Sequence, residues 1–456
     1  MTPCAAAIYA RPVSSSSSMD YMLDMDIGPL FPPIDEADRG LSSLARGVVG
    51  SEILRIAAEI RALKAKGAAI CNLTVGDFDP AYFPIPSELL EGTRVALAEG
   101  HTNYPPSDGV LALREAVTRL YARELGLNYP VDSVLIAGGA RPLLYGAYQT
   151  LLDPGDVALY PVPSWNNNHY TYLARGRAVE LPVSREANFF PTAAQIEPHL
   201  AEARLLTINS PLNPTGTVID RDELRRISEL VVQENKRRQR TGERPLWFVY
   251  DQVYWTLTFG ETKHVTPIEL VPEVAPYTLL LDALSKSMCA TGMRVGWGLM
   301  PPAVRRRMAD VLGHVGAWAP KAEQVAAATL LDAPEKRIAF QTSMKARVKE
   351  RLDALHNGFS AMEREGYPVE AIAPQGAIYL SARFNLFGRT IKGRTINTND
   401  DIRKLLLECA GLALVPFQAF GLRGETGWFR LSVGAVSMDD IRAAFPRLRD
   451  LMHGAR

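Results

Sequence analysis

A lysine near the end of one apolar segment is the first residue in this sequence that suggests chemistry. Lys286 lies in the stretch DALSK (282–286), which follows the apolar run 278–281. At the mouth of a buried strand and among small residues, a lysine amine is a candidate for a lowered pKa, which would make it a nucleophile toward carbonyl groups. A lone lysine is usually a solvated charge, so this interpretation depends on the spacing to Ser285 and Arg294.

Two other apolar runs end in polar residues that could meet a ligand. Asp251 follows the run 246–250, and Tyr254 comes three residues later. A carboxylate at the end of a buried strand costs desolvation free energy unless it meets a cation, although a helix cap is the plainer explanation. Asn213 lies between two prolines in SPLNPTGT (210–217), and its amide can donate a hydrogen bond to a ligand oxygen. A rigid connector without chemistry explains the same motif.

Two further segments suit an anion. Gly138 and Gly139 precede Ala140 and Arg141 at the start of a helical pattern. Backbone N–H groups at such a helix start can approach an anion closely, and a plain tight turn is an equally good interpretation. Arg294 can hold a phosphate with two parallel donors. Alone, the glycine pair is a weak signal for an anion site.

Short apolar runs alternate with helical patterns along the middle of the chain. The runs are 133–137, 156–160, 204–208, 246–250, 278–281 and 295–300. This alternation predicts an α/β fold with a mostly parallel sheet that is covered by helices on both faces. Ligands bind outside the carboxyl ends of strands in such sheets, so we expect the residues above to lie close together. After about residue 330, a long helix, a few strands and a last helix predict a second, smaller domain.

Composition excludes several classes of protein. The 456 residues carry 50 Lys and Arg against 50 Asp and Glu, and zero net charge argues against nucleic-acid binding. No apolar run reaches the roughly 18 residues of a membrane span, and the start lacks a signal-peptide pattern. Cys4, Cys71, Cys289 and Cys409 show no CxxC spacing, so neither a disulfide framework nor a metal site is expected. We therefore expect a soluble, cytoplasmic enzyme or binding protein.

From about residue 51 to the C-terminus, the sequence resembles the class I/II aminotransferases. These are pyridoxal 5'-phosphate (PLP) enzymes of fold type I, related to aspartate aminotransferase. Four motifs in this order carry the resemblance: SPLNPTGT (210–217), YDQVY (250–254), LSKSMCATGMRVGW (284–297) and FRLSVG (429–434). The resemblance implies the fold-type I architecture, with PLP in a large domain that has a mostly parallel sheet and with a smaller α+β domain beside it.

The resemblance also implies roles at the cofactor. Lys286 would form the Schiff base with PLP and then move a proton between the substrate Cα and the cofactor. Asp251 would pair with the pyridine nitrogen and keep it protonated. Asn213 and Tyr254 would hydrogen-bond the phenolic oxygen, and Trp165 would stack on the ring.

The remaining implied roles concern the cofactor phosphate. Backbone groups of Gly139, Ala140 and Arg141 would hold it together with the Ser285 hydroxyl and Arg294. Tyr104 matches a family tyrosine that reaches the phosphate of the neighbouring subunit, which implies a homodimer with shared active sites.

The substrate itself would lie beside Trp165 and Asn213. Arg430 would bind its α-carboxylate in a bidentate fork, with help from the backbone at Gly76.

Three positions depart from the family pattern. Gln252 follows Asp251 where the family often has Glu, and Ala140 stands where Ser or Thr is usual. Asn166 to Asn168, followed by His169, fill the stretch where some members keep a His that supports the Asp.

The resemblance predicts a ping-pong aminotransferase that moves an amino group from an L-amino acid to a 2-oxo acid. We lean toward aspartate and 2-oxoglutarate, because Arg141 could bind a second carboxylate; the alternative that Arg141 points to solvent has equal weight. Aromatic or neutral amino acids, and a PLP-dependent lyase or decarboxylase, remain alternatives. A PLP-fold DNA-binding regulator is disfavoured because no helix-turn-helix pattern is present.

We expect three parts of the chain. Residues 1–45, with a five-serine run, would be a flexible arm. Residues 46–80 and 330–456 would form the small domain, and 81–329 the large PLP-binding domain.

Overall fold

The computed structural model describes residues 30, 31, 33, 38–50 and 52–453, and the chain divides into two units, 1–48 and 49–456. In the first unit, α2 (Ser43–Gly47) begins after Ser42, whose hydroxyl accepts a hydrogen bond from the Ala45 N–H at 3.1 Å. The predicted arm at 1–45 lies mostly outside the described residues, and so does Cys4.

A seven-stranded sheet forms the centre of the second unit. Its strands are β2 (Val134–Ala137), β3 (Val157–Val162), β4 (Arg177–Pro182), β5 (Ala203–Asn209), β6 (Trp247–Asp251), β7 (Thr278–Ala283) and β8 (Gly296–Leu299). Their order is β2-β8-β7-β6-β5-β3-β4. The strand β8 runs opposite to the other six strands of this sheet, so the prediction of a mostly parallel sheet is confirmed.

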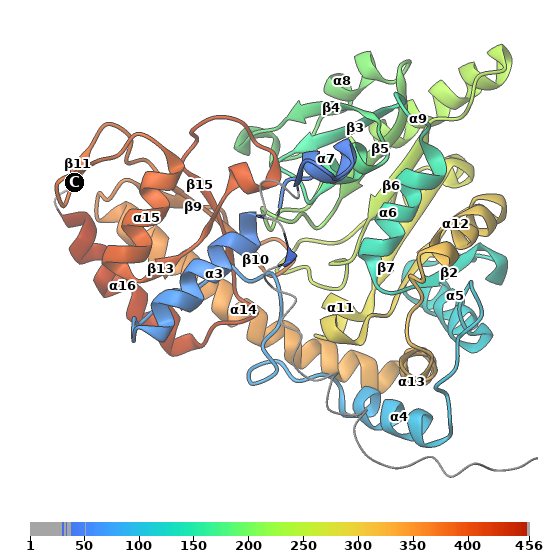
Figure 1. Cartoon of the computed structure of the whole chain (residues 1–456), viewed down its shortest axis with the longest axis horizontal. Coiled ribbons are helices and arrows are strands. Elements are labelled where there is room, and N and C mark those ends of the chain that lie inside the picture. The colour runs from blue at the N-terminus through green and yellow to red at the C-terminus, as the bar shows by residue number, and fades with distance from the viewer. Residues whose placement is uncertain (1–29, 32, 34–37, 51, 454–456) are drawn as a thin grey trace, which may run out of the picture. The chain divides into compact units, whose positions relative to one another are not determined.

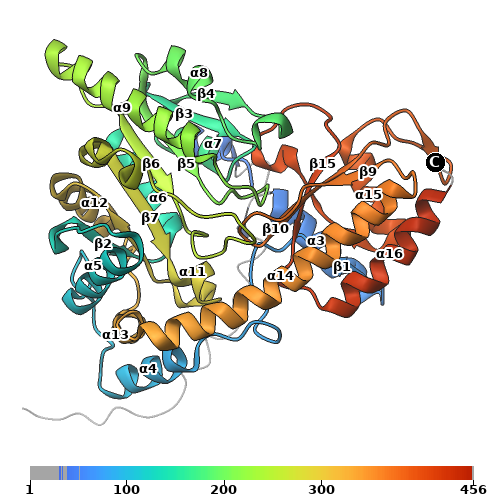
Figure 2. The same ribbon diagram turned by 180° about the vertical axis from the view of Figure 1, so that it is seen from behind.

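Helices cover both faces of this sheet, as Figures 1 and 2 show from opposite sides. One face packs on α6 (Ala140–Leu151), α7 (Asn167–Leu173) and α12 (Pro302–His314), and the other packs on α5 (Leu111–Leu125), α9 (Arg221–Thr241) and α13 (Lys321–Leu331). The strand β2 shows why two cores form. Its residues alternate, with Leu135 and Ala137 in the first core and Val134 and Ile136 in the second.

A second, four-stranded antiparallel sheet lies toward the C-terminus. Its order is β14-β15-β10-β9, with bounds Val415–Pro416, Trp428–Ser432, Tyr379–Phe384 and Val369–Ala371. The strand β1 (Cys71–Asn72) pairs in parallel with β13 (Leu412–Ala413), so an early segment joins the C-terminal part of the chain. The predicted domain bounds, 46–80 with 330–456 and 81–329, stay a prediction.

Further elements complete the second unit. The helices are α3 (Glu52–Ala65), α4 (Ser87–Ala98), α8 (Ala193–Ile196), α10 (Pro267–Leu270), α11 (Leu284–Ser287), α14 (Pro334–Arg364), α15 (Asn399–Ala410) and α16 (Met438–Met452), and β11 (Thr390–Ile391) pairs with β12 (Arg394–Thr395). Within the described residues, no helix has both the length and the apolar composition needed to cross a membrane.

The helix α14 links the two sheets. Its 31 residues make it about 46 Å long. Phe340 packs against the core of the seven-stranded sheet and also against the core of the four-stranded sheet, whereas Met344 to Met362 contribute only to the latter. Figure 2 shows the helix running from α13 toward β10.

Candidate functional site

A cavity of about 690 Å³ lies at the carboxyl ends of the central strands. Eleven of the thirteen predicted site residues line it: Gly76, Ala140, Arg141, Trp165, Asn213, Asp251, Tyr254, Ser285, Lys286, Arg294 and Arg430. Gly139 and Tyr104 are not among the lining residues. The chain therefore brings together residues from segments more than 350 residues apart in sequence, such as Gly76 and Arg430.

Lys286 reaches the cavity from the short helix α11, directly after β7. Its Nζ donates a hydrogen bond to the carbonyl oxygen of Gly76 at 2.7 Å. Burial lowers the pKa of the Lys286 amine to about 8, although the charge of Asp77 acts in the opposite direction. A substantial share of this amine is therefore neutral near pH 8, as a nucleophile toward carbonyl groups must be.

Asp251 is the last residue of β6 and is only 6% exposed. One carboxylate oxygen accepts a hydrogen bond from the Val253 N–H at 3.1 Å. Across the described part of the chain, no Lys, Arg or His side chain forms an ion pair with it. Burial raises the pKa of Asp251 to about 6. A buried acid without a cation at a cavity wall is suited to a ligand that carries positive charge.

Arg430 extends from β15 and is 1% exposed. Its Nη1 donates to Asn213 Oδ1 at 3.1 Å and its Nη2 donates to the carbonyl oxygen of Thr74 at 2.6 Å. The rings of Tyr379 and Phe420 each lie 4.8 Å from the guanidinium carbon, and no carboxylate in the described segments pairs with it. Burial lowers its pKa. This buried cation lacks an anionic partner.

The N-terminus of α6 and Arg294 form one wall together. Arg294 donates to the carbonyl oxygens of Gly138 at 2.6 Å and Thr291 at 2.7 Å. Gly139 has φ +97°, and a Cβ atom there would lie 2.5 Å from Arg294 Nη2. Gly139 does not line the cavity. Its role is indirect, because the lack of a side chain there lets Arg294 approach the helix. The free N–H groups of this helix start, beside a guanidinium, suit an anion.

Arg141, in the first turn of α6, is exposed and lines the cavity. Its guanidinium carbon is 5.3 Å from the centre of the Trp165 ring. No carboxylate within the described ranges forms an ion pair with Arg141. Besides Arg430 and Arg294, the cavity thus contains a third guanidinium, which is open to an anionic ligand.

Several site residues escaped the sequence prediction. Tyr379 shares a 2.7 Å hydrogen bond with the hydroxyl of Tyr254. Asn209 holds two predicted residues, because its Nδ2 donates to the backbone oxygen of Asp251 at 2.9 Å and its Oδ1 accepts from the Asn213 N–H at 2.8 Å. The spacing of Asn209 and Asn213 within one motif could have indicated this role. No local pattern marks Tyr379, which lies in a buried strand.

Tyr104 lies elsewhere. It is 81% exposed, and its ring contacts Trp318 at 5.3 Å between centroids. Within one copy of the chain, it takes no part in the cavity.

The departures noted in the sequence have structural consequences. Ala140 offers the helix start no hydroxyl group. Asn167 accepts a hydrogen bond from the Tyr148 hydroxyl at 3.2 Å and donates one to Ser164 at 3.1 Å. The Asn167 amide is thus paired with Tyr148 and Ser164, and no hydrogen bond joins it to Asp251 within the described residues.

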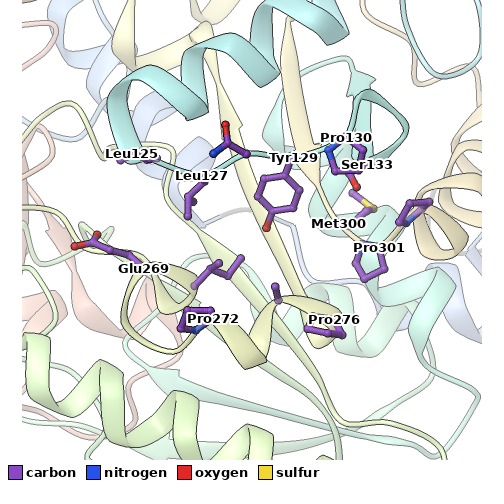
Figure 3. A pocket seen from close by; sticks show the side chains of 15 residues that line it. Leu125, Leu127, Tyr129, Pro130, Ser133, Glu269, Pro272, Pro276, Met300 and Pro301 are labelled. Atoms are coloured by element: carbon purple, nitrogen blue, oxygen red, sulfur yellow. The ribbon is translucent and has the colours of Figure 1, made fainter.

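A second cavity of about 650 Å³ lies at the opposite edge of the same sheet (Figure 3). Ser133 precedes β2, Pro272 and Pro276 precede β7, and Met300 follows the antiparallel β8. Figure 3 shows Tyr129 surrounded by proline side chains. Glu269 is the only ionisable acid or base in this lining apart from Tyr129, so the cavity lacks the cations and the amine of the first.

Comparison with known proteins identifies the family. A family model described as aminotransferase class I and II matches residues 68–448. The chain belongs to this family. The aminotransferase is 30% identical to the aspartate aminotransferase of Geobacillus stearothermophilus over 414 residues. This match covers 90% of this chain and 98% of that protein. A Rhizobium meliloti (strain 1021) aspartate aminotransferase is 29% identical over 402 residues, with coverage of 87% and 92%.

Solved structures agree with the sequence comparison. The aspartate aminotransferase of Rhizobium meliloti superimposes with a TM-score of 0.82 at 27% identity, covering 91% of this chain and 98% of that one. That of Thermus thermophilus gives 0.79 at 27% identity, covering 91% and 100%. The predicted fold type I, the aminotransferase activity and the PLP cofactor are confirmed.

The lining of the cavity fits PLP in three ways. Asp251 is a buried acid without a cation, as a protonated ring nitrogen requires. Lys286 presents an amine with a lowered pKa to an aldehyde. The helix start and Arg294 suit a phosphate group.

Proposed function

We propose that this aminotransferase takes its amino group from L-aspartate and passes it to 2-oxoglutarate. Apart from Arg294, which this proposal assigns to the phosphate, two guanidinium groups line the cavity without carboxylate partners in the described part of the chain. They belong to Arg430 and Arg141, and this observation supports the choice. Both substrates carry two carboxylates. A neutral amino acid would leave one of the two guanidinium groups without an anion.

The similar proteins point the same way. The relatives with the highest similarity given above are named aspartate aminotransferases. The Thermus thermophilus structure was determined with maleate, which is a four-carbon dicarboxylate. The two carboxylates of maleate agree with the two cationic contacts proposed for this chain.

Different residues of this chain would contact different parts of the cofactor. PLP, when bound, supplies an electron sink that stabilises negative charge at the substrate Cα. Asp251 holds a proton on the ring nitrogen by its negative charge. The helix start at Ala140, with Ser285 and Arg294, binds the phosphate, and Trp165 covers one face of the ring.

Lys286 and Arg430 act on the substrate. The Lys286 amine, free of charge in part because of its lowered pKa, accepts and returns the proton at the substrate Cα. Arg430 binds the α-carboxylate in a fork, and Gly76 lies beside it. Tyr254 and Asn213 orient the cofactor through hydrogen bonds. Arg141 binds the side-chain carboxylate, and Trp165 packs against its guanidinium.

The assembly is a homodimer in this proposal. Tyr104 is 81% exposed in one copy of the chain, and in a second copy it would reach the phosphate of the neighbouring site. A cytoplasmic location also stays a prediction.

A panel of amino donors tests the proposed substrates. Purified PLP-loaded protein is mixed with 2-oxoglutarate and aspartate, glutamate, alanine, phenylalanine or kynurenine, and glutamate and oxo-acid products are measured. Aspartate should give the highest kcat/KM. A preference for phenylalanine or alanine would contradict the proposal, and release of ammonia or carbon dioxide would instead indicate a lyase or decarboxylase.

A further inference from the structure

A second buried carboxyl group lies behind the cavity. Asp282 is the fifth residue of β7 and is 1% exposed. It does not line the cavity, and within the described ranges no cationic side chain forms an ion pair with it. On the adjacent strand β6, Asp251 pairs with Leu281, the residue before Asp282. Two buried acids thus lie at neighbouring strand ends.

Three donors surround the carboxyl group of Asp282. The Ala283 N–H donates to Oδ1 at 2.7 Å. The indole Nε1 of Trp255 donates to Oδ2 at 2.7 Å, and the Tyr121 hydroxyl donates to the same oxygen at 3.4 Å. An indole and a backbone N–H can only donate, so both oxygens act as acceptors here.

The direction of the Tyr121 hydroxyl hydrogen is fixed by its neighbours. Its oxygen accepts hydrogen bonds from Gln252 Nε2 at 3.1 Å and from Trp297 Nε1 at 3.3 Å. A phenol oxygen has two lone pairs, so its proton is left to point at Asp282. His264 Nε2 lies 3.3 Å from Gln252 Oε1 and completes the group. When Asp282 is ionised, all of these donors therefore have a charged acceptor.

These contacts converge on the segment that carries the proposed catalytic groups. Gln252 directly follows Asp251, and Trp255 directly follows Tyr254. The Gln252 N–H also donates to the carbonyl oxygen of Leu281 at 3.0 Å. The segment is thus tied at both ends to β7 and α5 through groups that do not touch the cavity.

We propose that Asp282 is a positioning residue, whose carboxyl group holds the segment Gln252–Trp255 in place and thereby holds Asp251 and Tyr254 at the cofactor cavity. The proposal rests on the role proposed above for Asp251. It does not depend on which amino acid is the donor.

The balance of charge at Asp282 gives this role a pH signature. Burial, and secondarily the charge of Asp251, raise the pKa of Asp282 to about 8, whereas the three donors oppose that rise. The facing groups from the packed elements are Asp251, Tyr121, Trp255, Trp297, Gln252 and His264. When Asp282 is protonated, its added hydrogen finds no free acceptor among these groups, and the neutral carboxyl group binds the hydrogens of Trp255 and Tyr121 more weakly.

The first experiment measures the network in the cofactor-free protein. The indole Nε1 proton of Trp255 is followed by NMR from pH 6 to 9.5 and assigned by Trp255→Phe. Its chemical shift should titrate with a midpoint near pH 8 in the wild type and become independent of pH in Asp282→Asn. A wild-type resonance that does not titrate, or an unchanged titration in Asp282→Asn, would overturn the proposed network.

The second experiment measures PLP affinity and separates positioning from general stability. Thr278→Val is the matched control, because it removes a buried hydroxyl at the other end of β7, where Thr278 donates to the Val274 carbonyl oxygen at 2.9 Å. Asp282→Asn should raise the Kd for PLP about tenfold, and Thr278→Val should leave it unchanged. Equal losses in the two variants would show that Asp282 is merely structural.

A third variant pair keeps the test independent of how Asp282→Asn folds. Trp255→Phe and Tyr121→Phe each withdraw one donor from an intact carboxyl group. Because the native pKa of Asp282 is raised, the unfolding free energy of the cofactor-free protein should fall as pH rises and level off at that pKa. Each variant should move this levelling-off to higher pH, since the native protein then keeps the Asp282 proton to higher pH. Unchanged pH–stability curves in both variants would contradict the assignment. If Trp255 titrates as expected in the wild type but Asp282→Asn leaves the Kd for PLP unchanged, the link from Asp282 to Asp251 would be contradicted.

Discussion

The two cavities at opposite edges of the seven-stranded sheet have nearly the same volume, about 690 and 650 Å³, but very different linings. The first contains Lys286, three arginines and two aspartates. The second has five prolines, with Glu269 as its only carboxylate, and Glu269 pairs with Arg221 at 3.5 Å. Space alone therefore does not mark a reaction site in this molecule.

The difference follows from the direction of the strands. Parallel strands end at one edge, where the chain can place polar residues in successive loops without disturbing the buried core. At the other edge, strands begin, and here the chain places prolines that fix the loop backbone. The edge where the parallel strands end has two charged side chains without ion-pair partners in the described residues, Asp251 and Arg430. The lining of the cavity at the other edge has instead a buried hydroxyl without a hydrogen-bond partner, that of Tyr129.

The largest expected effect comes from Lys286→Ala. Without the amine, transamination should fall by about 10⁴-fold, because the proton at the substrate Cα loses its acceptor. PLP should still bind, but borohydride should fix none of it to the protein. Measurable turnover comparable with the wild type would refute the role of Lys286.

Asp251→Ala should come next. Loss of the buried negative charge should weaken PLP binding and slow the reaction by about 10³-fold. Steady-state rates at saturating PLP, together with equilibrium dialysis, separate the two effects. Asp251→Glu serves as the control that keeps the charge, and it should recover part of the affinity.

A smaller and more selective effect is expected for Arg141→Ala. The KM for aspartate should rise about tenfold, the size of a lost charged hydrogen bond, while the KM for alanine stays within about twofold. The neutral donor is the internal control. Equal changes for both donors would show that Arg141 points to solvent.

The lowered pKa of Lys286 predicts a dependence on pH. Cofactor-free protein should capture PLP faster as pH rises through about 8, because the Lys286 amine loses its proton there. The measurement is the growth of borohydride-fixed cofactor with time between pH 6.5 and 9. A rate that rises only near pH 10 would mean that the amine has an ordinary pKa.

The smallest effect on catalysis is expected in the second cavity. Tyr129→Phe should leave kcat and KM unchanged and raise the unfolding free energy by about 1 kcal/mol, because a buried hydroxyl without a hydrogen-bond partner is removed. Activity and thermal unfolding check this. A loss of activity would mean that the two edges are coupled.

Much of the site could be predicted because its residues follow strands within short motifs. Asp251, Asn213 and Lys286 each lie within a few residues of an apolar run, so sequence patterns place them at one edge. The strand β4 was missed for the opposite reason. As an edge strand, it is mostly exposed or half-buried, and it shows no apolar run.

The contacts that connect these motifs could not be predicted in this way. Tyr379 meets Tyr254 across 125 residues, and Tyr121 meets Asp282 across 161. Each lies among apolar neighbours in a strand or helix, where a tyrosine is ordinarily a core residue. Only the tertiary structure shows which buried hydroxyl groups face each other.

The length of α14 has a consequence for how the enzyme comes apart. The single helix α14 packs against the cores of both sheets. Phe340 contacts both cores, and the residues from Met344 to Met362 contribute to the core of the four-stranded sheet. Melting either sheet therefore withdraws support from the helix that the other sheet needs. Heat should then destroy both in a single cooperative step, although the chain is large enough to behave as two calorimetric units.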